Sequence, residues 1–97
     1  IAGQARRDEK IFAAWDGERY HYPAFQFEPD GGPRSQTAKL IKVLPRESDG
    51  RLGLDAVFWV FWPDYAFDGK TPAEAFTLEP ERVIEEARTR FLEGGRD

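Results

Sequence analysis

Aromatic residues are unusually dense in one short segment of the chain. Positions 58–67 hold Phe58, Trp59, Phe61, Trp62, Tyr65 and Phe67. Residues 57–62 are β-branched or aromatic, and taken alone they favour a strand. However, Asp55 is typical of a first helical turn, and Phe58 and Trp62 are four positions apart, which favours a helix. We expect a helix from about Leu54, while the strand remains the open alternative.

The same segment is too apolar for a domain of this size to cover. A helix that is apolar on all sides must be buried on all sides, and a chain of 97 residues can rarely surround one completely. Part of its surface should therefore meet another chain, because tryptophan and tyrosine are common anchors of protein interfaces. We expect self-association, at least to a homodimer, through Phe58, Trp59 and Trp62.

Length, amino-acid composition and net charge limit the kinds of protein that this chain can be. The length is typical of one domain, and the apolar share of 40% is enough for a compact core. The absence of cysteine excludes disulfides and thiol nucleophiles. A net charge of −4 argues against a nucleic-acid surface, which needs clustered Lys and Arg to neutralise phosphates. We therefore expect no nucleic acid to bind through these residues alone.

Neither a membrane helix nor a signal peptide is apparent in the sequence. No stretch approaches the roughly 20 apolar residues that a membrane helix needs, and no charged segment followed by an apolar one opens the chain. We expect a cytoplasmic protein with no membrane partner. Residues 1–10 should be a lead-in or the end of an upstream segment with a function of its own, residues 11–93 a single domain, and residues 94–97 a tail.

The first structured element should be a β-hairpin. Asp16-Gly17 lies between two strand-like runs, 11–15 and 18–22, which is a strong hairpin signal. With a two-residue loop, Trp15 faces Glu18, Ala13 faces Tyr20 and Ile11 faces Tyr22. These side chains form one face, which should lie on the core. The opposite face, with Phe12, Ala14, Arg19 and His21, should be wetter, and residues 23–27 should continue extended.

Helices should follow the turn-rich segment 28–33. Ser35 is a plausible N-cap for a helix over residues 36–44, which Pro45 ends. Thr71-Pro72-Ala73-Glu74 has the pattern of a capping box and predicts a short helix to about Thr77. Pro80 opens a last helix with Val83, Ile84, Ala87 and Phe91 on one face, closed by Gly94-Gly95. We predict an α+β fold, a small β-hairpin packed on a bundle of about four short helices.

Residues that could carry catalysis or bind a metal are sparse. His21 is the sole histidine, and neither a metal site nor a general base has its partners nearby in sequence. Ser35 and Ser48 lack the glycines of a nucleophile elbow. Asp55, Asp64 and Asp68 lack the ligand spacing of a calcium loop. We therefore expect a binding module, not an enzyme, with no metal and no cofactor.

Several motifs resemble the toxin-binding domain of Xre/MbcA/ParS-type antitoxins. They are, in order, Tyr22-Pro23-Ala24-Phe25-Gln26-Phe27, Trp59 with Pro63, Phe67-Asp68-Gly69-Lys70-Thr71-Pro72-Ala73-Glu74, and Val83. The resemblance spans roughly residues 10–92, and it also favours a helix over the aromatic segment. Two positions depart from the family pattern: Asp64 stands where Asn is usual, and Phe67 where Leu is common. Such antitoxins usually carry an N-terminal DNA-binding segment as well, which the 97 residues do not include.

This resemblance implies a cognate toxin as the partner. The toxin would be of the RES type, which consumes NAD or transfers ADP-ribose to proteins, and the antitoxin would occlude its active site. The implied contact residues are Arg88, Arg90, Phe91 and Arg96 in the last helix and tail, whose guanidinium groups suit acidic or phosphate-binding groups. Tyr65, Phe67 and Lys70 of the preceding loop are further candidates.

Two other classes of function are compatible with the sequence. The hairpin at residues 11–22 could be the wing of a DNA-binding regulator, although the acidic charge counts against it. A small oligomeric interaction protein of another role is the second alternative. An enzyme is the weakest interpretation, because the usual catalytic motifs are missing.

Overall fold

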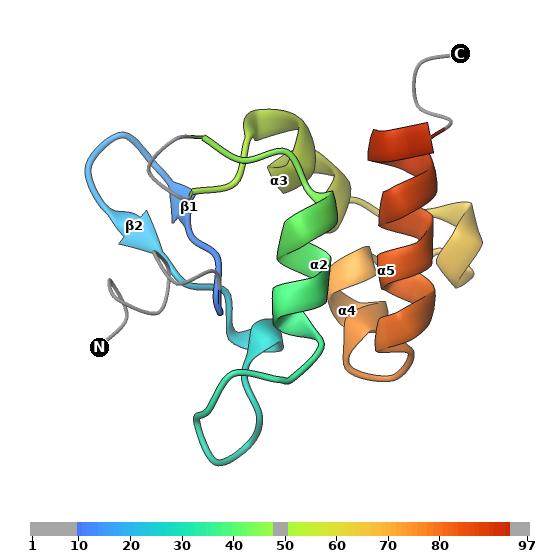
Figure 1. Cartoon of the computed structure of the whole chain (residues 1–97), viewed down its shortest axis with the longest axis horizontal. Coiled ribbons are helices and arrows are strands. Elements are labelled where there is room, and N and C mark those ends of the chain that lie inside the picture. Colours follow the sequence, from blue (N-terminus) through green and yellow to red (C-terminus); the bar gives the residue numbers. More distant parts are fainter. Residues whose placement is uncertain (1–9, 48–50, 94–97) are drawn as a thin grey trace.

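A β-hairpin lies beside a group of short helices. The computed structural model describes residues 10–47 and 51–93. Strands β1 (Ala14–Trp15) and β2 (Tyr20–His21) pair antiparallel, and helices α2 (Thr37–Val43), α3 (Leu54–Val60), α4 (Pro72–Phe76) and α5 (Pro80–Arg88) follow. In Figure 1 the hairpin lies on one side of the helices and α5 on the other. The predicted α+β fold, a hairpin with about four short helices, is confirmed.

The core forms where α5 meets α2 and α4. Val83, Ile84 and Ala87 are buried on one face of α5, as the spacing predicts. Leu40 of α2 and Phe76 of α4 are fully buried in the same cluster. The periodicity of the last helix therefore identified the face on which it packs.

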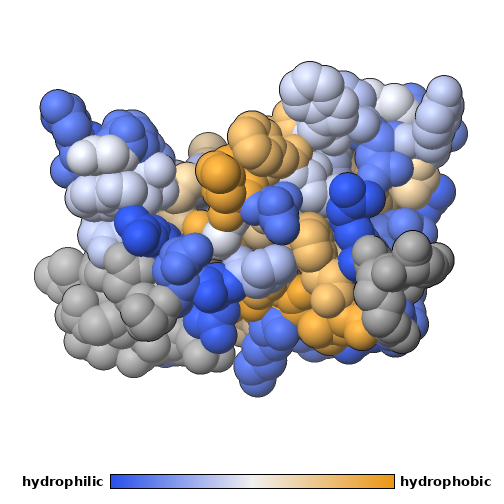
Figure 2. Space-filling model, turned by 90° about the horizontal axis from the view of Figure 1, so that it is seen from above, coloured by the Kyte–Doolittle hydropathy of each residue, from blue (hydrophilic) through white to orange (hydrophobic). Residues whose placement is uncertain are grey.

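The aromatic segment is a helix, as expected. Within α3, Ala56, Trp59 and Val60 are buried, while Leu54 and Phe58 are exposed. Burial of one face against the core outweighs the local preference for a strand, because tertiary packing routinely overrides weak propensities. Figure 2 views the chain from the side on which α3 lies and shows hydrophobic side chains gathered across the middle of this face.

Helix α4 begins as the sequence predicts. The Thr71 hydroxyl accepts a hydrogen bond from the Glu74 backbone N–H, and the Glu74 carboxylate accepts one from the Thr71 N–H. Pro72 occupies the first turn, where its missing N–H costs nothing. Gly69 has a φ of 87°, which confirms that the chain turns there in a conformation that glycine favours. A 3-10 helix, Tyr65–Phe67, precedes this turn.

The predicted hairpin register is wrong. Trp15 pairs with Tyr20 and Ala14 with His21, so the loop has four residues, 16–19, instead of two. The Asp16 carboxylate accepts hydrogen bonds from the backbone N–H groups of Glu18 and Arg19, at 2.8 and 2.9 Å. An aspartate that bonds the backbone two residues ahead creates its own turn. The loop therefore extends beyond Asp16-Gly17.

The predicted faces of the hairpin are wrong in part. Ile11 and Ala13 are buried and Arg19 and His21 are exposed, as predicted, but two other residues are reversed. Phe12 is fully buried, not wet, and Trp15 is exposed, not in the core. Residues 11–13 leave the hairpin: the Ala13 carbonyl accepts from the Leu52 N–H, and Ala13 bridges to Arg51. Strand alternation holds only for the two-residue strands, so it cannot be extended back to Phe12.

The segment 23–27 is not extended as predicted. Ala24–Gln26 form a 3-10 helix that directs the Gln26 side chain into the core. There Gln26 Oε1 accepts from the Phe12 N–H at 2.8 Å, and Gln26 Nε2 donates to the Phe12 carbonyl at 3.0 Å. The Gln26 amide thus satisfies both backbone groups of Phe12, as a neighbouring strand would do in a sheet.

Helix α2 begins later than predicted, and Ser35 is not its N-cap. The N-cap is Gln36, with no side-chain capping bond. A turn leads into the helix instead, since the Thr37 N–H donates to the Arg34 carbonyl at 3.0 Å. The Thr37 hydroxyl is buried and donates to the Gln26 carbonyl, which fixes the helix start to the 3-10 helix.

The last helix changes its winding near its end. Helix α5 runs over Pro80–Arg88 and continues as a π-helical turn, Thr89–Glu93. The expected stop at Gly94-Gly95, the tail 94–97 and all but the last residue of the lead-in 1–10 lie outside the described residues. Among the residues described, no helix has the length and apolar character needed to cross a membrane.

Candidate functional site

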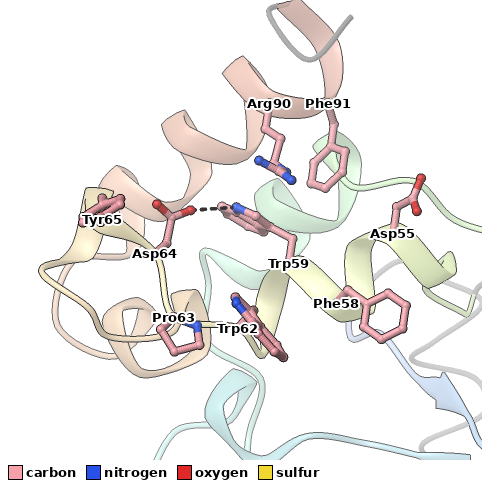
Figure 3. A pocket seen from close by; sticks show the side chains of 9 residues that line it. All are labelled: Asp55, Phe58, Trp59, Trp62, Pro63, Asp64, Tyr65, Arg90 and Phe91. Carbon is pink, nitrogen blue, oxygen red and sulfur yellow. Dashed lines mark hydrogen bonds between the residues drawn. The ribbon is translucent and has the colours of Figure 1, made fainter.

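Six of the ten predicted contact residues line one groove. It has a volume of about 850 Å³ and lies between α3, the 3-10 helix Tyr65–Phe67 and the end of α5. Figure 3 shows its lining: Phe58, Trp59, Trp62, Tyr65, Arg90 and Phe91. Asp55, Pro63 and Asp64 complete it. The groove combines residues predicted for the toxin contact with residues predicted for self-association.

Trp59 forms the floor of the groove and is fixed in orientation. Its indole Nε1–H donates to Asp64 Oδ2 at 3.2 Å, and Asp64 Oδ1 accepts from the Ala66 N–H at 2.9 Å (Figure 3). Phe67 packs edge-on against the buried indole from the other side, with ring centroids 6.4 Å apart. Both oxygens of Asp64 are thus engaged, one on the floor and one on the loop beside it.

Arg90 and Phe91 form the wall opposite α3. The Phe91 ring packs edge-on against Trp59, with centroids 5.7 Å apart, and is half-buried. The Arg90 guanidinium lies 5.9 Å from the centroid of the Phe91 ring. Within residues 10–47 and 51–93, no carboxylate pairs with Arg90. This cation is therefore available to an external carboxylate or phosphate.

Exposed aromatic side chains form the rim. Tyr65 is fully exposed, and Trp62 and Phe58 are exposed over most of their surface. Large apolar side chains in water favour association, because burying one releases on the order of 1.5–3 kcal/mol. The groove therefore suits a partner that brings apolar side chains together with an acidic group.

Some predicted site residues lie elsewhere. The Phe67 side chain is buried in the core and does not line the groove, whereas the buried Trp59 contributes only the floor of the groove. Lys70 is exposed outside the groove. Arg88 is half-buried and pairs with Glu85, with 3.8 Å between Nε and Oε1. Arg96 lies outside the described residues.

Comparisons with known proteins add no family. No family model, no curated protein and no solved structure matches the chain. The groove must therefore be interpreted from its own geometry and from the motifs in the sequence.

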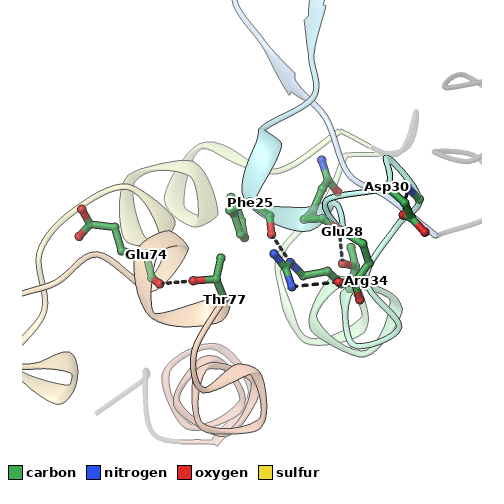
Figure 4. A network of polar contacts seen from close by, with 9 residues as sticks. Phe25, Glu28, Asp30, Arg34, Glu74 and Thr77 are labelled. Carbon is green, nitrogen blue, oxygen red and sulfur yellow. Dashed lines mark hydrogen bonds and ion pairs between the residues drawn. The ribbon is translucent and has the colours of Figure 1, made fainter.

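A second, shallower groove lies between the hairpin and α4. It has a volume of about 590 Å³, and Tyr22, Phe25, Phe61, Glu74 and Thr77 are among its lining residues. Its polar groups are bonded within the chain: Thr77 donates its hydroxyl to the Glu74 carbonyl, and the Arg34 guanidinium donates to the Phe25 carbonyl (Figure 4). No residue predicted for a site lines this groove.

Among the described residues, no three His, Asp or Glu side chains cluster at metal-binding distance. His21 Nε2 lies 2.5 Å from Asp16 Oδ2 on the exposed hairpin. Hydrogen bonds from the Arg19 backbone, then from His21 and the Glu18 backbone, lower the pKa of Asp16 from 3.8 to about 2. This pair secures the turn; Asp16 lies outside both grooves, and His21 lines the second one.

Sequence reasoning missed Asp64 and Asp55 as parts of the site. Asp64 was visible only as a departure from the family pattern, yet both of its oxygens are engaged. Asn has one oxygen and one donor group, so it cannot accept both bonds. Asp55 looked like a first-turn residue, and only the folded chain brings it to the same groove as Arg90.

Proposed function

We propose that this chain is an antitoxin-like protein-binding module that neutralises a RES-type toxin by occluding its active site. The observation that carries the proposal is the aromatic groove with Arg90 on its wall, a cation that pairs with no carboxylate among the described residues. Two further features support it: the order of the motifs along the chain, and the capping box formed by the Thr71-Pro72-Ala73-Glu74 motif.

The partner contact is assigned to the rim and wall of the groove. Trp, Tyr and Arg are the residue types that most often dominate binding energy at protein interfaces. Trp62, Tyr65 and Arg90 supply all three around one concavity, and the half-buried Phe91 supports Arg90. Arg90 would pair with an acidic or phosphate-binding group of the toxin, and a planar guanidinium can do so with two parallel bonds.

Other predicted residues take peripheral places in this proposal. Arg88 is partly engaged by Glu85, and Lys70 lies beyond the groove, so each would contribute long-range attraction more than affinity. The wing of a DNA-binding regulator gains no support from the hairpin, whose tip carries the exposed carboxylates of Asp16 and Glu18. Phosphate contacts require the opposite charge.

Growth rescue tests the proposal. The chain is co-expressed with the RES-type toxin encoded beside it, and full growth is expected with the wild-type chain. Arg90→Glu combined with Tyr65→Ala should abolish rescue, since the charge reversal repels the group that Arg90 would pair with. Arg19→Glu is the matched control, an exposed arginine on the hairpin away from the groove, and it should rescue fully.

Two outcomes would overturn the proposal. Rescue by the folded double variant at wild-type level would show that the groove is not the contact surface. Failure of the wild-type chain to rescue, at an expression level confirmed by immunoblot, would remove the antitoxin function itself. Circular dichroism of each variant establishes that it is folded.

A further inference from the structure

The outer face of α3 is an apolar stripe without a partner. Leu54, Phe58, Phe61 and Trp62, here called the α3 stripe, are exposed over 68%, 62%, 43% and 70% of their surface. Leu54 and Phe58 are four residues apart on one face of α3, and Phe61 and Trp62 follow directly after its last residue, Val60. Phe61 also packs edge-on against Phe25, so it forms the border of the stripe towards the second groove. Asp55 is the sole charged residue of α3, and it lies at the edge of this face.

The area of this stripe is what one half of an interface requires. With roughly 200 Å² for a large side chain, the exposed fractions amount to about 500 Å² of surface. Two such stripes in contact would bury about 1,000 Å², the lower bound for a biological interface, before any neighbouring residue is included.

The pattern of the stripe is also self-complementary. Leu54 and Trp62 are each four residues from Phe58, so a two-fold axis beside Phe58 pairs Phe58 with its own copy. The same axis brings Leu54 of one copy beside Trp62 of the other. The two α3 helices must then run antiparallel, which separates the two Asp55 carboxylates by about 9 Å along the helix axis. A parallel pair would place these like charges together, at a cost.

We propose that a second copy of this chain covers the α3 stripe and forms a two-fold homodimer in which the α3 helices pack antiparallel about Phe58. The proposal goes beyond the binding of a toxin and is tested without one. Phe58 and Trp62 line the groove as well, so a second copy and a toxin would compete for these two side chains. The sequence predicted Trp59 for this contact as well. Its side chain is buried beneath the stripe, so it would support the exposed side chains without touching the second copy.

The chain has no cysteine, so single introduced cysteines report the arrangement without background. Helix axes about 10 Å apart, the wide end of the usual range, with Cα atoms about 2.3 Å from each axis, bring facing Cα atoms to about 5.4 Å. This is disulfide range. Phe58→Cys should therefore cross-link to itself under mild oxidation. Leu54→Cys should not, because its two copies lie about 12 Å apart along the axis.

Mixing gives the sharpest test of the direction of packing. Leu54→Cys mixed with Trp62→Cys should give a cross-linked heterodimer, although each variant alone stays uncross-linked. Leu78→Cys is the matched control, because Leu78 is 71% exposed but lies outside the stripe. Self-cross-linking of Leu54→Cys, or cross-linking of Leu78→Cys at the same rate as Phe58→Cys, would overturn the arrangement.

Sedimentation velocity on the full chain, without toxin, tests the dimer itself. Wild type should be dimeric at 10–100 µM. Leu54→Glu should weaken the dimer at least tenfold, and Leu78→Glu should leave it unchanged. Leu54 does not line the groove, and a glutamate in the first turn suits the helix, so folding and the proposed toxin contact are spared. A strictly monomeric wild type, or equal weakening by both variants, would overturn the proposal.

Discussion

Gln26→Met is expected to destabilise the fold strongly although it barely changes the side-chain volume. Gln26 is fully buried and makes three hydrogen bonds, two to Phe12 and one from Nε2 to the Pro23 carbonyl at 3.1 Å. Methionine is similar in length and unbranched, so it should fill the same space. It carries no N–H donor and only a weak acceptor. The substitution therefore isolates the hydrogen bonds from the packing.

The cost follows from what the substitution leaves behind. Phe12 is itself fully buried, so its N–H and carbonyl would lose their partners where water cannot replace them. An unsatisfied buried polar group costs about 1–3 kcal/mol, which gives about 2–6 kcal/mol for the pair. Burying the more apolar methionine offsets on the order of 1 kcal/mol. We expect a net loss of about 1–5 kcal/mol in the free energy of unfolding.

Urea denaturation followed by tryptophan fluorescence measures this loss. Gln36→Met is the matched control, because Gln36 is half-buried and makes no side-chain capping bond, so it should change stability by less than about 0.5 kcal/mol. If Gln26→Met costs no more than Gln36→Met, the Gln26 amide does not hold Phe12 in the core, and the explanation of the hairpin faces is wrong.

Three further predictions follow from other parts of the structure. Val83→Asp should prevent folding, seen as a lost melting transition, because it buries an unpaired charge, whereas Arg90→Glu on the exposed side should leave the melting temperature almost unchanged. Asp64→Asn should cost about 1 kcal/mol in urea denaturation, since one of two donors, the Trp59 indole or the Ala66 N–H, loses its acceptor; an unchanged midpoint would contradict the assigned bonds. The lowered pKa of Asp16, about 2 against 3.8, means that its contribution to stability is complete above about pH 4 and is lost as the pH falls towards 2. Carboxyl titration by NMR should give this pKa, and a value near 3.8 would contradict the turn.

The helical half of the chain could be predicted because its signals are local. The capping box at Thr71 and Glu74 is a direct interaction between near neighbours in sequence, and the burial of Val83, Ile84 and Ala87 follows from their spacing. The structure of the aromatic segment was harder to predict, because its residue types favour a strand. The segment is helical because a helix packs Trp59 and Val60 against the core.

The hairpin half could not be predicted in the same way. Alternation along residues 11–15 assigns Phe12 to the outer face, but Gln26, fourteen residues further on, holds Phe12 inside through its side chain. No pattern in the sequence marks a glutamine that replaces a strand. The four-residue loop likewise depends on the particular bonds of the Asp16 carboxylate and not on the Asp-Gly pair.

The groove was predicted in its residue types but not in its geometry. Tyr65, Arg90 and Phe91 come together with Phe58, Trp59 and Trp62 only because the end of α5 packs beside α3. Two surfaces that the sequence suggested separately therefore share residues. Phe67 belongs to the same run of aromatic residues, yet it lies in the core. The sequence shows how many aromatic residues the segment contains, but it does not show which of them face water.

The NAD-consuming activity of the toxin is the most direct test of the proposed function. A RES-type toxin from a neighbouring gene, which the proposal predicts, is purified and assayed for NAD loss while the chain is added in increasing amounts. We expect complete inhibition at a one-to-one ratio with the wild-type chain and with the Arg19→Glu control. The Arg90→Glu and Tyr65→Ala double variant should leave the activity intact. Undiminished NAD consumption at a tenfold excess of folded wild-type chain would contradict the proposal that this groove occludes a toxin.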